Sequence, residues 1–182
     1  MSDISRINLL KILRIKRHKY FDEILPENIK LNNIMHMGIR DLMLEALKNE
    51  SKEALLIIQD KNIKKYRICT SDKYNSIKIP DDIKAVMQDG SSKFIMVHNH
   101  PNNSIFSLRD IRTLIEYDCL CYIGVITNNC KNIILACVNE QDEFTRFDML
   151  EYIDNNENNK DNVSIIKDLY SMGLVCRVYK NY

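Results

Sequence analysis

Short apolar runs, each bounded by turn residues or by a helical pattern, constrain the fold of this chain more than any other feature. The clearest run, Glu53–Asp60 (EALLIIQD), has five consecutive apolar residues, which is typical of a strand buried on both faces. A two-residue Asn128-Asn129 turn separates two later runs and predicts a hairpin. Further strands are expected over 64–70, 93–97, 121–127, 132–138 and 174–179.

Helical patterns alternate with these runs. The segment 37–49 places Ile39, Leu42, Met43 and Leu47 on one face of a helix. Pro80 opens a short helix that ends near Gly90, and two more helices are expected over 108–117 and near 161–170. This alternation predicts an α/β or α+β domain with a mixed sheet flanked by helices.

The chain is expected to divide into three parts: a basic amphipathic segment over 1–36, a core over 37–138, and an acidic extension over 139–182 that packs on the core. Residues 6–19 hold six Lys or Arg and no acid. The favoured interpretation of this stretch is a helix with a solvated basic face. The alternative is an arm that binds nucleic acid or anionic lipid.

Composition narrows the class of protein. The formal net charge of +1 argues against a dedicated nucleic-acid coat protein. The apolar share of 45% and the charged share of 28% argue against wholesale disorder. No apolar run approaches the ~18 residues of a membrane span, and the first twenty residues lack a signal-peptide pattern. We therefore expect a cytoplasmic protein whose six cysteines are reduced.

The residues with the clearest chemistry follow the strand expected at 93–97. His98 and His100 are two positions apart, so in extended backbone both imidazoles project to the same side. Pro101 then ends the strand, and Asp110 lies in the first turn of the next helix. Two imidazoles and one carboxylate would leave a fourth position open, which is the pattern of a catalytic Zn²⁺ that activates water.

The same residues also have a purely structural interpretation. Ser107 and Asp110 could form a capping box at the start of the helix, with His98 and His100 at the surface of the loop. The combination of H-x-H-P at a strand end with S-x-x-D shortly after favours the metal site. The two roles of Asp110 are compatible, because a carboxylate has two oxygens.

The string His98-Asn99-His100-Pro101, followed by Ser107 and Asp110, resembles the motif of the JAMM (JAB/MPN+) metalloproteases, and HNHP is most similar to their RadC-like bacterial branch. The resemblance covers roughly 37–138. It implies a cytidine-deaminase-like JAB/MPN fold and one zinc ion per chain, held by His98, His100 and Asp110. It also implies that Ser107 donates a hydrogen bond to the developing oxyanion.

This sequence departs from the motif in two places. Nine residues separate His100 from Asp110, one fewer than in the common form, and Asn103 replaces a glycine typical of the RadC-like branch. We expect a tighter loop that still brings the same ligands together.

The resemblance further implies a glutamate that acts as general base, on the strand after the first long helix. Glu53 fits this place, 45 residues before His98. Glu50 is the nearest alternative, and Glu45 lies within the helix. Without a catalytic role, Glu53 would be a solvated residue at the start of a strand.

Other metal or nuclease sites fit less well. A nucleobase deaminase needs H-x-E with P-C-x-x-C, which the pair Cys119 and Cys121 does not supply. The letters H-N-H do not make an HNH nuclease, whose residues are spread over a ββα unit. His18 and His36 have no neighbouring ligand pattern and are interpreted as structural or surface residues.

The sequence thus predicts a zinc-dependent peptidase or isopeptidase that acts on a protein or peptide. The alternative is a RadC-like protein associated with DNA or mobile elements, which binds rather than cleaves. Nucleic acid is the less favoured partner, and no membrane span is expected.

Overall fold

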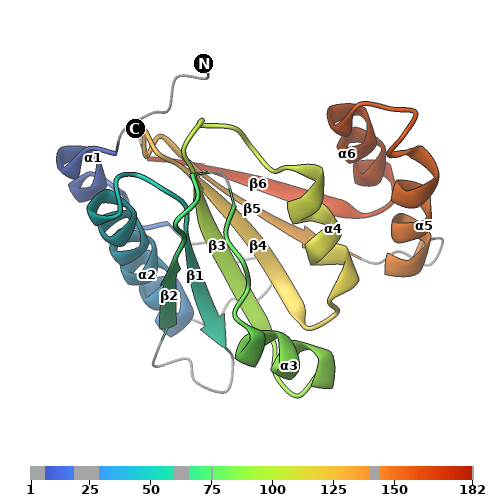
Figure 1. The fold of residues 1–182 in the computed structure, drawn as a ribbon, viewed down its shortest axis with the longest axis horizontal. Coiled ribbons are helices and arrows are strands. Elements are labelled where there is room, and N and C mark those ends of the chain that lie inside the picture. Colours follow the sequence, from blue (N-terminus) through green and yellow to red (C-terminus); the bar gives the residue numbers. More distant parts are fainter. Residues whose placement is uncertain (1–6, 19–28, 60–65, 75, 140–143, 182) are drawn as a thin grey trace.

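The predicted strands pair into one six-stranded sheet with helices on both faces (Figure 1). The computed structural model describes residues 7–18, 29–59, 66–74, 76–139 and 144–181. Across the sheet the strand order is β2-β1-β3-β4-β5-β6. The strands are β1 (Ala54–Gln59), β2 (Tyr66–Thr70), β3 (Phe94–His100), β4 (Leu120–Thr127), β5 (Asn132–Val138) and β6 (Leu174–Lys180). The predicted class, a mixed sheet flanked by helices, is confirmed.

Strands β3 and β4 are parallel, and every other neighbouring pair is antiparallel. Parallel neighbours need a crossover connection, which here contains α4 (Leu108–Glu116). The chain therefore leaves the carboxyl end of β3, turns back through a loop, and enters α4. This path brings the first turn of α4 near the last residues of β3.

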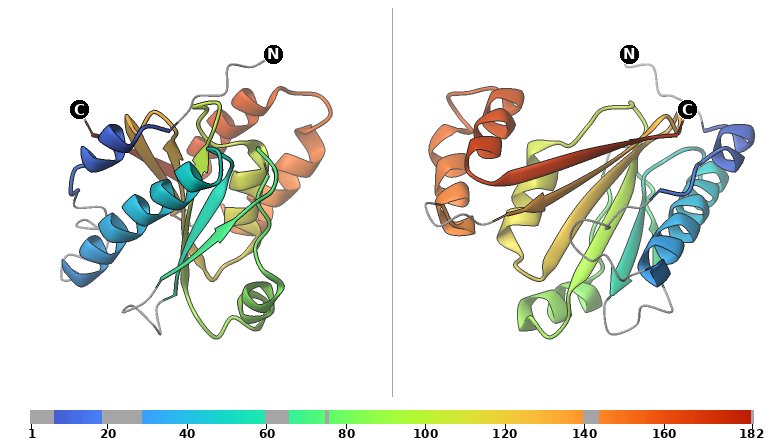
Figure 2. Two further views of the ribbon diagram at one scale, coloured as in Figure 1. Left: turned by 60° about the vertical axis from the view of Figure 1, so that its left-hand side comes forward. Right: turned by 180° about the vertical axis from the view of Figure 1, so that it is seen from behind.

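Two layers of helices cover the sheet (Figure 2). Helices α1 (Leu9–Leu13) and α2 (Ile29–Lys48) lie on one face. The other face is covered by α3 (Asp81–Asp89), α4, α5 (Arg146–Asn156) and α6 (Asn162–Ser171). Along β1 the side chains alternate between these layers, with Leu56 packed towards α2 and Leu55 towards α4. Close packing depends on Gly38 of α2, because a Cβ atom there would lie 2.8 Å from Leu56 Cδ1.

The amino-terminal part differs from its prediction. The helix expected to start at residue 37 begins at Ile29, because Leu31 and Met35 continue its buried stripe by another two turns. The division expected between residues 36 and 37 thus falls inside one helix. Of the basic helix expected over 6–19, the described residues contain only α1, and residues 6 and 19 lie outside the described residues.

The carboxyl-terminal part adds to the sheet. Helix α6 and strand β6 match their predictions, and β6 pairs along its whole length with β5. Helix α5 was not predicted. Its two buried residues, Met149 and Ile153, are surrounded in the sequence by acidic residues, so no clear apolar pattern indicated a helix. A capping box between Thr145 and Asp148 marks its start.

None of the helices in the described ranges has the length and hydropathy needed to cross a bilayer.

Candidate metal centre

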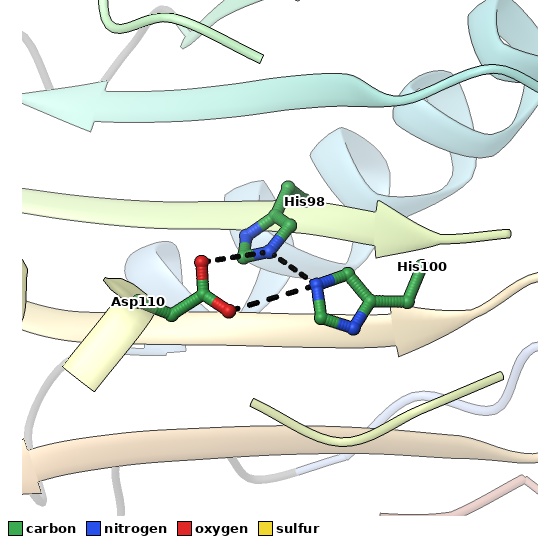
Figure 3. A group of neighbouring side chains, drawn as sticks. All are labelled: His98, His100 and Asp110. Carbon is green, nitrogen blue, oxygen red and sulfur yellow. Dashed lines mark hydrogen bonds and ion pairs between the residues drawn. The ribbon is translucent and has the colours of Figure 1, made fainter. Parts of the chain in front are cut away.

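Strand β3 carries both histidines within its regular structure. It runs to His100, three residues beyond the predicted end at Val97, so the H-N-H triplet is strand rather than loop. His98 and His100 therefore project to the face covered by α4, while Asn99 projects to the opposite face. Figure 3 shows the two imidazoles on β3 and the carboxylate of Asp110 on the first turn of α4, all pointing towards one another.

The distances within this group suit a metal ion. His98 Nε2 lies 2.8 Å from His100 Nε2 and 3.3 Å from Asp110 Oδ1. His100 Nε2 lies 3.6 Å from Asp110 Oδ2. Ligand atoms at 2.0–2.1 Å from a tetrahedral zinc ion are about 3.3 Å apart. Within the part of the chain that the structure describes, this is the one group of three or more such side chains close enough to hold a metal.

A second contact orients His100. Its Nδ1 lies 3.1 Å from the carbonyl oxygen and 2.9 Å from the hydroxyl oxygen of Ser104. An Nδ1–H that donates to Ser104 leaves the lone pair of Nε2 directed at the group, as a metal ligand requires. Sequence reasoning missed Ser104, because it lies in an irregular loop and belongs to no recognised motif.

The segment from Ser107 to Asp110 forms the expected capping box, and the same carboxylate also faces the two histidines. The backbone N–H and the hydroxyl of Ser107 each donate to Asp110 Oδ2 at 2.7 Å, and the N–H of Asp110 donates to Ser107 Oγ at 3.2 Å. This is the capping box. Oδ2 accepts the hydrogen bonds of the cap and also lies 3.6 Å from His100 Nε2, while Oδ1 faces His98. The Ser107 hydroxyl, expected to donate to substrate, donates here to Asp110.

The shortened loop still closes on the histidines. Asn103 has a φ of 56°, a left-handed conformation that favours glycine and that asparagine tolerates better than most residues. Its Oδ1 accepts a hydrogen bond of 3.0 Å from the N–H of Asn129, which ties the loop to the β4–β5 turn. The replacement of the motif's glycine by Asn103 is therefore compatible with the required backbone.

Glu53 reaches the group from the neighbouring strand. The β1–β3 register pairs Leu55 with His98, so its continuation places Glu53 opposite His100 on the same face. Glu53 is only 6% exposed and lines the same cleft as the histidines. The two alternatives lie elsewhere: Glu50 pairs with Lys52 at the surface, and Glu45 pairs with Lys48 on α2.

Burial and charge set the protonation of the group. Burial raises the pKa of Glu53 to about 7, and the negative charge of Asp110 adds a smaller increase. The positive charges of His98 and Arg109 act in the opposite direction. Burial and the neighbouring His98 lower the pKa of His100 to about 4, which keeps its imidazole neutral. Burial opposes the charge on Asp110, but hydrogen bonds from His98 and Ser107 hold the pKa of that carboxyl well below its ordinary value.

The pKa of His98 is raised, because the hydrogen bond and charge of Asp110 outweigh the burial that favours the neutral imidazole. The group therefore pairs one anionic carboxylate with one imidazole of raised and one of lowered pKa. A bound cation would replace the proton that this arrangement favours on His98.

The group opens into a cleft of about 700 Å³. One side of its lining comes from α4, and another from residues 76–81 and Lys84, before and within α3. Glu53, His98, His100 and Asp110 all contribute to the lining. A ligand in this cleft could therefore reach the candidate metal position directly.

Asn99, on the opposite face of β3, fixes the backbone around Glu53. Its Oδ1 accepts from the N–H of Ala54 at 2.7 Å, and its Nδ2 donates to the carbonyl of Lys52 at 3.1 Å. These two residues flank Glu53 in the sequence. Asn99 is fully buried, and sequence reasoning assigned it no role.

The remaining candidates lie apart from this centre. His18 hydrogen bonds to Asn181, and His36 is buried on α2, across the sheet from the cleft. Cys119 is buried where β4 begins and Cys121 is half-buried within β4, and among the described residues neither forms a disulfide bond.

Comparison of the chain with models of protein families, with curated proteins and with solved structures finds no match. The chemical interpretation of the centre therefore rests on its own geometry.

Proposed function

We propose that this chain is a zinc-dependent peptidase or isopeptidase of the JAMM type, with the JAB/MPN fold. The observation that carries the proposal is the convergence of His98, His100 and Asp110 beside a cleft that also holds the buried Glu53. Two imidazole nitrogens and one carboxylate oxygen form the ligand set of many catalytic zinc sites. The orientation of His100 by Ser104 supports the same assignment.

Zinc held by these three residues would supply Lewis-acid activation of water and of the scissile carbonyl. In the proposed reaction Glu53 takes a proton from the attacking water and passes it to the leaving amine. Its pKa is about 7 in the metal-free protein, and the charge of a bound zinc ion would lower that pKa and so favour the carboxylate that accepts the proton. The Ser107 hydroxyl then donates a hydrogen bond to the oxyanion of the tetrahedral intermediate, in place of its present hydrogen bond to Asp110.

The test uses a complex mixture of peptides from a digested proteome and a set of ubiquitin-like conjugates. Both are incubated with the zinc-loaded protein, and mass spectrometry identifies new amino termini in the peptides and unmodified lysine side chains released from the conjugates. Cleavage should require zinc and should disappear in Glu53→Gln. Glu50→Gln is the matched control and should cleave as the parent does, because Glu50 pairs with Lys52 outside the cleft. Cleavage that continues in Glu53→Gln would refute the assigned base.

A second function, DNA association without cleavage, is favoured by one observation. Arg14, Lys16 and Arg17 are exposed after α1, and their side chains form no ion pair with the described residues. They lie across the sheet from the cleft. If these cations and Lys11 contact phosphates, log affinity for duplex DNA should fall with log salt at a slope of about −4. A flat dependence would eliminate this function.

A further inference from the structure

The cleft beside the candidate metal centre is lined by three cations that form no ion pair with the described residues. Arg109 precedes Asp110 on the first turn of α4, is exposed, and lines the cleft. Lys78 and Lys84 line the cleft from the segment that leads into α3 and from α3 itself. With the residues that the structure describes, none of the three forms an ion pair or a side-chain hydrogen bond.

One turn further along α4, Arg112 behaves differently. Its guanidinium lies 2.6 Å from Asp154 and 3.5 Å from Glu157, so its charge is used to hold α4 against α5. Arg112 has a structural role, whereas Arg109 forms no ion pair and, although its charge acts on Glu53, its guanidinium can still bind a ligand. The two arginines lie on the same helix and line the same cleft, so they form a matched pair for comparison.

The charges around the cleft favour a small anionic group. Asp81 and Glu116 also line it, so cations and carboxylates share the walls. A continuous phosphodiester chain would meet repulsion from these acids, whereas a single carboxylate can reach one cation. Arginine is suited to this task because its planar guanidinium binds both oxygens of a carboxylate.

We propose that Arg109 binds a carboxylate of the substrate and thereby selects peptides that carry a negative charge close to the scissile bond. This inference rests on the proposed peptidase function. Consecutive Cα atoms are about 3.8 Å apart, so Arg109 and Asp110 are neighbours at the same end of the cleft. The selected carboxylate should therefore lie about one or two residues from the bond that reaches the metal. It is either an acidic side chain or the carboxyl terminus of the peptide.

The experiment measures binding rather than turnover, with zinc-loaded Glu53→Gln protein to prevent hydrolysis. Its probes are eight-residue peptides, acetylated and amidated, in which one Asp is moved along an alanine and glycine background, each with an Asn counterpart. A second pair compares a free with an amidated carboxyl terminus. A charge-assisted bidentate bond predicts about tenfold tighter binding for the charged member of one of the two pairs. The pair that shows the preference identifies the source of the carboxylate.

Adding Arg109→Gln should reduce this ratio to about one, while adding Arg112→Gln should leave it unchanged. Equal binding of charged and neutral peptides, absence of binding by all of them, or a preference that survives Arg109→Gln would each overturn the proposal. Displacement of the peptides by a duplex oligonucleotide in an Arg109-dependent way would overturn it in favour of a phosphate ligand. If Arg109-dependent binding is found but the zinc-loaded parent cleaves no bound peptide, the carboxylate site stands and the peptidase function fails.

Discussion

Two buried polar clusters lie at the same end of the sheet, on opposite faces, and β3 contributes to both. The cleft cluster consists of the buried Glu53, His98 and His100 with the partly buried Asp110. The asparagine cluster consists of Asn99 and Asn128, which hydrogen bond to each other, and Asn181, which binds the β4–β5 turn. In the asparagine cluster the amides bind mainly to backbone: Asn128 donates to the carbonyl of Ser51, and Asn181 donates to that of Cys130. In the cleft cluster the nitrogens and oxygens face one another and the open cleft.

The difference in hydrogen-bond partners distinguishes a cluster that only supports the fold from one that can bind a ligand. Buried amides that bind backbone fix the positions of the segments that they join, and no ligand is needed to balance them. Two imidazoles and a carboxylate that converge at 2.8 to 3.6 Å concentrate lone pairs in one place, which a cation would balance. The asparagine cluster supports the cleft cluster, because Asn99 holds the residues on both sides of Glu53.

The largest expected effect comes from the cleft cluster. Glu53→Gln removes the group that accepts a proton and should lower hydrolysis by about 10²- to 10⁴-fold, with zinc content unchanged. The check is turnover of a cleaved peptide, with elemental analysis of the same sample. Glu50→Gln should match the parent. Parent-like turnover in Glu53→Gln would place the base elsewhere.

A smaller effect is expected from the asparagine cluster. Asn99→Ala removes three hydrogen bonds and leaves the N–H of Ala54 and the carbonyl of Lys52 without this partner, which should cost about 1–3 kcal/mol of unfolding free energy. Because the backbone around Glu53 loosens, hydrolysis should fall while zinc remains bound. Asn128→Ala is the matched control, because it removes hydrogen bonds from the same cluster but Asn128 does not bind the residues that flank Glu53. Equal losses of activity in both variants would show that Asn99 has no special role in holding Glu53.

The smallest effect concerns pH. The pKa of Glu53 is raised from 4.5 to about 7 by burial, so between these values the folded protein binds a proton that the unfolded chain releases. The metal-free protein should therefore lose stability as pH rises from about 4.5 to about 7, by about 1–2 kcal/mol after allowance for solvent screening. Glu53→Gln should remove this loss.

Urea unfolding at pH 5 and pH 8, in the presence of a chelator, measures the effect. His98 and His100 titrate in both proteins. Because the charge of Glu53 also raises the pKa of His98, the difference between parent and Glu53→Gln measures the carboxyl group together with its effect on His98. An identical pH dependence in the two proteins would show that Glu53 is not perturbed in the metal-free state.

The same comparison explains what the sequence could predict. His98, His100 and Asp110 form a local pattern, and the alternation of a strand is enough to place both imidazoles on one side. Glu53 could be anticipated only through the family resemblance, because its nearness to His98 depends on the register of two strands 45 residues apart.

Contacts that link distant segments were invisible in the sequence. In the sequence Asn99 is the middle residue of H-x-H, a position to which the motif assigns no role. Its hydrogen-bond partners Lys52 and Asn128 lie 47 and 29 residues away. Asn128 was assigned only to the hairpin turn, and Asn181 was assigned no role. Helix α5 was missed because its acidic residues outnumber the two that it buries, Met149 and Ile153.

The central claim is that His98, His100 and Asp110 hold one metal ion. It is tested most directly by adding zinc to the chelator-treated full chain, removing the excess by gel filtration, and measuring the metal by elemental analysis. The account predicts about one zinc per chain in the parent and in His18→Ala, whose histidine lies across the sheet from the cleft. It predicts almost none in the double variant His98→Ala, His100→Ala. Full zinc retention by the folded double variant, or no zinc in the parent, would contradict the account.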